Sequence, residues 1–170
     1  GYVVLWPRRE VLDKGTKSYE KPETFVAGFE YLERIGAVDR SRISFIGFSV
    51  GSSTALVAAA DPRIASVHGF VFFGGYYDIF DYLVSLATHT MTFDSKQSTW
   101  EPTEGAVSHA KEILKEQQIE WTSITEKERV VLKSLSPAEN LQNFKAQIFI
   151  LHDKNDTYVP YVESVKLRQA

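Results

Sequence analysis

A serine stands between two glycines at a spacing that could support nucleophilic chemistry. The stretch reads Gly47-Phe48-Ser49-Val50-Gly51, which is the pattern G-x-S-x-G. In a sharp strand-to-helix turn, this pattern presents the serine hydroxyl at the tip in a strained conformation, and the glycines fit where the chain approaches itself closely. The following helix would point its free N–H groups at the serine, and the N–H of Val50 would be one donor to an oxyanion. The stretch therefore predicts a nucleophile elbow with Ser49 as the nucleophile.

The residues on both sides of this serine have the composition that such a turn requires. Residues 42–48 are an apolar run rich in β-formers, and a polar turn at 39–41 precedes them. Residues 52–60 are small and apolar, which favours a helix that Asp61-Pro62 ends. Strand, turn and helix are the context that separates this motif from a chance match. The alternative interpretation is a tight turn whose serine merely caps the helix.

A serine hydroxyl is a poor nucleophile at neutral pH, so it needs a histidine as general base and a carboxylate to orient that histidine. In one known chain order, the acid and then the histidine follow the serine. Two aspartates fit the acid: Asp156, after the expected strand 146–151, and Asp78, after the expected strand 67–73. Asp153, Asn155 and Asp156 also suggest a cation site, but they lack the glycine and the distal glutamate of a calcium loop. We therefore expect no metal here.

The rest of the chain follows an alternating α/β pattern. An apolar run at 2–6 predicts a strand buried on both faces, and a polar loop with Arg8 and Arg9 follows it. We expect a mostly parallel sheet with helices on both faces. The expected strands are 2–6, 43–48, 67–73 and 146–151, and the expected helices are 22–35, 52–60, 137–144 and 161–170.

Residues 81–135 interrupt this alternation. Helices are expected at 82–87, 108–118 and 125–135, with an irregular stretch at 91–105. An excursion of this length between sheet strands is typical of a cap that supplies the substrate pocket and excludes water. The alternative is a plain surface insertion.

Composition excludes several classes of function. The chain has 170 residues, 44% of them apolar and 24% charged, which suits one globular domain. The net charge is −3 without a basic run, so nucleic acid is not an expected partner. No apolar run is long enough to cross a bilayer. Cysteine is absent, which excludes disulfides, thiolate catalysis and thiolate metal sites.

Further segments carry a resemblance to a known family. Residues 38–43 read Val-Asp-Arg-Ser-Arg-Ile, residues 74–78 read Gly-Gly-Tyr-Tyr-Asp, and residues 151–160 read Leu-His-Asp-Lys-Asn-Asp-Thr-Tyr-Val-Pro. Together with the G-x-S-x-G stretch and the region around Trp100-Glu101-Pro102, they resemble bacterial α/β-hydrolases of the dienelactone-hydrolase, esterase and prolyl-oligopeptidase type. The resemblance covers nearly the whole chain.

The resemblance assigns the acid. In this superfamily the last of these segments reads roughly L-H-G-x-x-D-x-x-V-P, and its second acidic position is the triad acid. That position is Asp156 in this sequence, while Asp153 replaces the usual glycine. Among the alternatives above, the resemblance therefore favours Asp156 over Asp78.

The resemblance also implies parts that residues 1–170 do not supply. The triad histidine is expected after one further strand, beyond Ala170, and the second oxyanion donor on a loop before Gly1. His152 matches a structural family position beside the acid, and the chain order argues against every histidine present as the base: His68, His89, His109 and His152. We therefore expect a partial hydrolase domain over 1–170, with a core at 1–80 and 136–170 and a helical cap at 81–135.

The expected function is that of a serine hydrolase acting on small carboxylic esters without a cofactor. Peptidase, thioesterase and acyltransferase activities of the same fold remain open, because the pocket decides among them. A non-catalytic binding or scaffold protein is the alternative from another class. We expect a cytoplasmic protein, weak or no activity in the isolated chain, and a sheet edge left exposed by missing strands.

Overall fold

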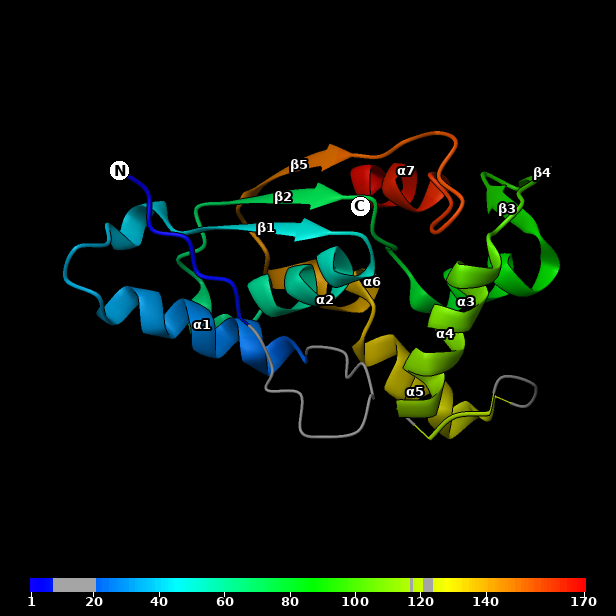
Figure 1. Cartoon of the computed structure of the whole chain (residues 1–170), viewed down its shortest axis with the longest axis horizontal. Coiled ribbons are helices and arrows are strands. Elements are labelled where there is room, and N and C mark those ends of the chain that lie inside the picture. Colours follow the sequence, from blue (N-terminus) through cyan, green and yellow to red (C-terminus); the bar gives the residue numbers. More distant parts are fainter. Residues whose placement is uncertain (8–20, 117, 121–123) are drawn as a thin grey trace.

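The structure is a computed structural model that describes residues 1–7, 21–116, 118–120 and 124–170 (Figure 1). These residues form a mixed α/β fold around a small parallel sheet. The loop residues Arg8 and Arg9 lie outside the described residues. The helices are α1 (Pro22–Arg34), α2 (Val50–Ala59), α3 (Ile79–Thr88), α4 (Glu104–Glu116), α5 (Glu126–Ser134), α6 (Pro137–Asn140) and α7 (Val162–Gln169). The strands are β1 (Ser44–Phe48), β2 (Gly69–Phe73), β3 (Thr90–Phe93), β4 (Lys96–Thr99) and β5 (Gln147–Leu151).

The sheet at the centre of the fold has the order β1-β2-β5, and both pairings are parallel. Its register aligns Phe48 with Phe73 and Phe73 with Leu151, so the three strands end at the same level. Figure 1 shows the three arrows pointing the same way, toward the side of the molecule where α3, α4 and α7 lie. The predictions of strands at 43–48, 67–73 and 146–151 in a parallel sheet are confirmed, with slightly shorter bounds.

Helices cover one face of this sheet. Phe70 and Phe72 of β2 pack against Leu56 of α2 and Leu167 of α7. α1 adds Val26 and Phe29 to a second cluster with Ile43, Ala58 and Ile64, and the Phe29 ring stacks on Phe45 of β1 at 5.8 Å. The helix predicted at 22–35 is confirmed, with Pro22 in its first turn.

The prediction of helices on both faces is wrong for the described residues. On the opposite face Ile46, Phe48 and Phe149 are exposed. The reason is topological, because the strand order runs in one direction and right-handed crossovers then put every connecting helix on the same face.

The apolar run at 2–6 is not a strand in the structure. It pairs with none of the described strands, and Tyr2 is 96% exposed. A strand needs a neighbour that bonds its backbone N–H and C=O groups, and among the described residues this run has no such neighbour, although β1 and β5 are both edge strands of the sheet. Leu5 lies against α1, since its Cδ2 would be 3.2 Å from a Cβ placed at Gly28.

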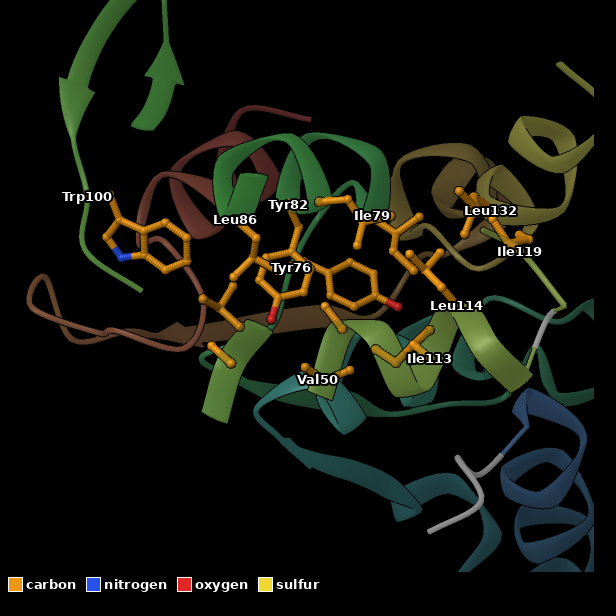
Figure 2. Packing of buried hydrophobic residues seen from close by; sticks show 14 residues of the cluster. Val50, Tyr76, Ile79, Tyr82, Leu86, Trp100, Ile113, Leu114, Ile119 and Leu132 are labelled. Carbon is orange, nitrogen blue, oxygen red and sulfur yellow. The ribbon is translucent and has the colours of Figure 1, made fainter. Parts of the chain in front are cut away.

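The region 81–135 shares a hydrophobic core with the end of the sheet. Figure 2 shows Val50 of α2 below the rings of Tyr76 and Tyr82, which stack with centroids 5.6 Å apart. Leu132 of α5 and Val159 of the loop after β5 belong to the same cluster. The helices predicted at 82–87, 108–118 and 125–135 are present as α3, α4 and α5, with different bounds.

The stretch 91–105, predicted to be irregular, contains the antiparallel hairpin β3–β4. Its two turn residues, Asp94 and Ser95, both have positive φ, at 49° and 59°. A two-residue hairpin turn of this kind favours Asn-Gly, so the Asp-Ser turn gave no signal. No helix among the described residues is long and apolar enough to span a bilayer.

Candidate active site

Ser49 occupies a strained turn between β1 and α2. Its backbone has φ 52° and ψ −144°, a region that side-chain-bearing residues rarely adopt. The Ser49 N–H donates to the Phe73 carbonyl at 2.7 Å, and its own carbonyl accepts from the N–H of Ser52 at 2.9 Å, so both sides of the turn are held. Its hydroxyl makes no capping hydrogen bond to α2. The interpretation of Ser49 as a simple helix cap is therefore wrong.

The two glycines of the motif differ in what they do. A Cβ at Gly47 would lie 2.5 Å from Cα of Ser52, so no side chain fits there. A Cβ at Gly51 would meet nothing within 4 Å. The close approach predicted for both glycines is confirmed at Gly47 only. Phe48, between them in the motif, points to the exposed sheet face, with its ring 5.9 Å from that of Phe73.

Val50 is the first residue of α2. The first N–H groups of an α-helix have no intrahelical partner, and the helix dipole favours negative charge beside them. The Val50 side chain is buried in the core shared with α3 and α4, which fixes the direction of its backbone. The structure thus keeps the predicted oxyanion donor beside Ser49 on a packed element.

Asp156 lies in the loop after β5, and backbone N–H groups of the same loop hold its side chain in place. Its Oδ1 accepts from the N–H groups of Tyr158 at 2.7 Å and Val159 at 3.1 Å. Its Oδ2 lies 3.4 Å from Nε2 of His152. Partial burial acts to raise the pKa of Asp156, but the contacts with His152 and the two N–H groups outweigh it and lower the pKa below the usual aspartate value. Asp156 is therefore ionised at neutral pH.

The end of β2 lies between the serine and the acid. Phe73 accepts the hydrogen bond from Ser49, and the next residue, Gly74, donates its N–H to Leu151 at 2.9 Å. Gly74 has φ 65°, and a Cβ there would lie 3.4 Å from Oδ2 of Asp156. Ser49 and Asp156 therefore flank the same turn at the carboxyl edge of the parallel sheet, where ligands bind in α/β folds.

His152 contacts the acid but is engaged elsewhere. Its Nε2 lies 3.0 Å from the Val159 carbonyl, and its Nδ1 lies 2.6 Å from Oγ of Ser164. A carbonyl oxygen can only accept, so Nε2 carries the proton, and Nδ1 accepts from the Ser164 hydroxyl in the neutral ring. His152 thus links the acid loop to α7, as its expected structural role requires.

The other histidines lie in different parts of the fold. His68 is exposed at the amino end of β2, away from the serine. His89 ends α3 and lies 3.4 Å from Glu101. His109 belongs to α4. Each occupies an element other than the two loops that carry Ser49 and Asp156.

Asp78, the alternative acid, caps α3. Its Oδ1 accepts from the N–H groups of Phe80 at 2.7 Å and Asp81 at 3.3 Å. A buried glutamate that the sequence did not single out, Glu163, accepts from the N–H groups of Tyr77 and Asp78 at 3.0 and 2.9 Å. Burial raises the pKa of Glu163, against the opposing effect of its neighbour Lys166. These contacts give Asp78 and Glu163 structural roles.

The region 81–135 is attached directly to the loop that carries Asp156. The indole Nε1–H of Trp100 donates to the main-chain carbonyl of Asp156 at 2.8 Å, and the N–H of Thr103 donates to Thr157 at 3.0 Å. A Cβ at Gly105 would lie 2.6 Å from the hydroxyl of Tyr158, so the start of α4 packs closely on that ring. No local pattern in the sequence indicates these contacts, because they join segments more than fifty residues apart.

Tyr82 is a buried polar residue that the sequence did not identify. Its side chain is fully buried in the cluster that contains Val50, and within the part of the chain that the structure describes its hydroxyl has no hydrogen-bond partner. Burial raises the pKa of Tyr82, so the hydroxyl remains a donor at neutral pH.

Asp153 accepts from the N–H of Asn155 within its own turn, and the described residues include no group of three or more acidic or histidine side chains arranged for a metal.

Comparison with known protein families, curated proteins and solved structures finds no match to this chain. The function of the site is therefore inferred from its geometry alone. That geometry combines a strained, exposed serine at a helix N-terminus with an ionised aspartate across the end of the same central strand.

Proposed function

We propose that this chain carries the nucleophile and the acid of a serine hydrolase with an α/β-hydrolase fold, acting on small carboxylic esters. The observation that carries the proposal is Ser49 at φ 52° between β1 and α2. Strain of this kind persists only where the surroundings impose it, and it is typical of functional sites. Asp156 at the same sheet edge supplies the second group that this chemistry needs.

In the proposed reaction, Oγ of Ser49 attacks the acyl carbonyl while a histidine takes its proton. The Val50 N–H donates to the oxyanion of the tetrahedral intermediate. Asp156 orients the histidine and stabilises the imidazolium that forms. The histidine then protonates the departing alcohol, and water, activated in the same way, releases the acid and restores Ser49. The histidine and the second oxyanion donor of this proposal come from outside residues 1–170.

Val50, which follows Ser49 in the chain, packs in an apolar cluster with Tyr76, Tyr82 and Trp100, and these side chains are buried in a core rather than lining a pocket. The proposal of a small ester therefore comes from the chemistry of Ser49, and peptidase, thioesterase or acyltransferase chemistry has no separate observation in its favour.

A non-catalytic binding or scaffold protein is the second candidate. The observation that favours it is the engagement of both ring nitrogens of His152, the histidine in contact with Asp156. A serine without a base would keep its geometry and react slowly with electrophiles.

Fluorophosphonate labelling of the natural polypeptide that contains residues 1–170, read by intact mass, tests the proposal. We expect one adduct on the wild type and none on Ser49→Ala. Ser66→Ala, at an exposed serine that donates to Glu33, is the matched control and should label like the wild type. A folded wild type without an adduct, or an adduct retained in Ser49→Ala, would contradict the proposal and favour the scaffold.

A further inference from the structure

The five residues between β2 and α3 lie between the two groups of the proposed site. We call residues 74–78 the central turn. Just before it, the Phe73 carbonyl accepts from the N–H of Ser49 at 2.7 Å. At its first residue, Gly74, a Cβ would lie 3.4 Å from Oδ2 of Asp156. A shift of the central turn would therefore change the position of Ser49 relative to Asp156.

Separate helices hold the backbone of the central turn. The Ser53 hydroxyl of α2 donates to the Tyr76 carbonyl at 2.7 Å. The N–H of Ala138 in α6 donates to the Tyr77 carbonyl at 3.1 Å. These two contacts satisfy acceptors of the turn, and two consecutive donors, the N–H groups of Tyr77 and Asp78, need acceptors in return.

One buried side chain accepts from both donors. Oε2 of Glu163, in the first turn of α7, accepts from the N–H groups of Tyr77 at 3.0 Å and Asp78 at 2.9 Å. The Glu163 side chain is fully buried. Figure 1 shows α7 on the side toward which the three strands point, so the carboxylate reaches the central turn from the carboxyl edge of the sheet.

The charge of Glu163 is balanced by a lysine on the same helix. Nζ of Lys166 donates to Oε1 of Glu163 at 2.6 Å and to Oδ2 of Asp81 at 2.7 Å. Replacing a buried ion pair by apolar side chains of similar volume is often neutral or stabilising, so the charges themselves are not needed for stability. The feature that an apolar side chain would lack is the oxygen that the two N–H groups share.

We propose that Glu163 is a positioning residue of the serine hydrolase, which holds the central turn in the shape that sets Ser49 against Asp156. This inference rests on the proposed function. Glu163 acts through the main chain of Tyr77 and Asp78 and touches neither proposed catalytic group. A misplacement of about 1 Å in an active site can cost about 100-fold in rate, so we expect loss of this acceptor to slow the reaction of Ser49 at least about 10-fold.

Two double variants separate the acceptor oxygen from the ion pair. Glu163→Gln with Lys166→Met removes both charges and keeps an oxygen for the two N–H groups. Glu163→Met with Lys166→Met removes the charges and the oxygen, with a side chain of similar length. The control, Glu139→Met with Lys133→Met, removes a more exposed ion pair of 3.7 Å. Urea unfolding checks that each variant is folded under the labelling conditions.

Fluorophosphonate labelling of the natural polypeptide that contains residues 1–170 gives the rate. Varying the reagent concentration separates the maximal rate of adduct formation from the affinity for the reagent. We expect the Glu163→Met double variant to lose at least about 10-fold in maximal rate at unchanged affinity. The Glu163→Gln double variant and the control should react like the wild type. Glu163→Asp keeps the charge but shortens the side chain, so it should also react more slowly, and it serves where the Glu163→Met double variant is unfolded.

Amide hydrogen exchange measures the hold on the central turn directly. The N–H groups of Tyr77 and Asp78 should exchange faster in the Glu163→Met double variant than in the Glu163→Gln one. Equal maximal rates in these two folded variants, a wild-type rate in Glu163→Asp, or equal exchange at both amides would overturn the proposal. A folded wild type without an adduct would instead contradict the hydrolase proposal itself, and Glu163 would then have a structural role only.

Discussion

At the scale of single residues, Ser49 shows how the site stores strain. A serine at φ 52° costs free energy that glycine would not, because glycine has no Cβ. The hydrogen bonds to Phe73 and from Ser52 hold the turn in this shape. The fold therefore keeps a serine, which is less favourable than glycine in this conformation, at the position where the proposed chemistry needs a hydroxyl.

Two substitutions at this position separate strain from function. Ser49→Gly should raise the free energy of unfolding by about 1 kcal/mol, and Ser49→Ala should leave it nearly unchanged, since alanine keeps the Cβ. Both variants should fail to react with a fluorophosphonate. Urea unfolding measures the difference, and equal stability of the glycine and alanine variants would show that the turn is unstrained.

Asp156 makes a pH-dependent contribution at the same scale. Its pKa is lower in the folded protein than in the unfolded chain, so its ionised form stabilises the fold above the unfolded value of about 4. This contribution is lost as the pH falls through the folded pKa. Asp156→Asn should therefore be less stable than the wild type at pH 7, and the gap should close below about pH 4.

The same variant also tests the proposed role of the acid. Asparagine cannot stabilise an imidazolium, so labelling of Ser49 should slow by about 10²-fold or more. The control is Asp153→Asn, at an exposed residue outside the proposed triad. Equal labelling rates in the two variants would remove Asp156 from the triad while leaving its structural role intact.

At the scale of elements, the β1–α2 junction depends on one glycine rather than two. Gly47→Ala should destabilise the fold by about 2 kcal/mol or more, because its Cβ would lie 2.5 Å from the backbone of Ser52. Gly51→Ala, in the first turn of α2 with open space around it, should be neutral or stabilising by up to about 1 kcal/mol. Thermal unfolding of the pair measures how closely the strand and the helix approach, and the opposite order of stability would contradict this geometry.

The elements also show which parts of the fold could be predicted from the sequence. The β1–Ser49–α2 unit is local, so its apolar run and glycines were sufficient to predict it. The hairpin β3–β4 escaped prediction because Asp94 and Ser95 form a turn that normally contains glycine. An apolar strand looks the same in sequence whether one or two faces are covered, so the exposed face that carries Ile46 and Phe149 could not be foreseen. The contacts of Trp100 and Glu163 with distant backbone have no local signal at all.

At the scale of the whole molecule, two packed regions meet along the carboxyl edge of the sheet. One core lies between the sheet and α1, α2 and α7, and the other joins α3, α4 and α5 to Val50 and Val159. Ser49 stands between them. The placement explains how a residue can be both exposed and rigid, since Val50 after it is buried in the second core and its own N–H is bonded to the Phe73 carbonyl of the central strand.

The attachment of Trp100 to the Asp156 carbonyl has a consequence for how this architecture could be rebuilt. In a modular enzyme, the segment that shapes specificity can be exchanged while the reactive groups stay behind. Here Trp100, which follows the hairpin β3–β4, is hydrogen-bonded to the backbone of Asp156, and a second hydrogen bond joins Thr103 to Thr157. A transplanted insertion at 81–135 would displace the acid unless it brought an equivalent donor. In the proposed hydrolase, substrate preference should therefore change by point substitutions within the insertion rather than by its replacement.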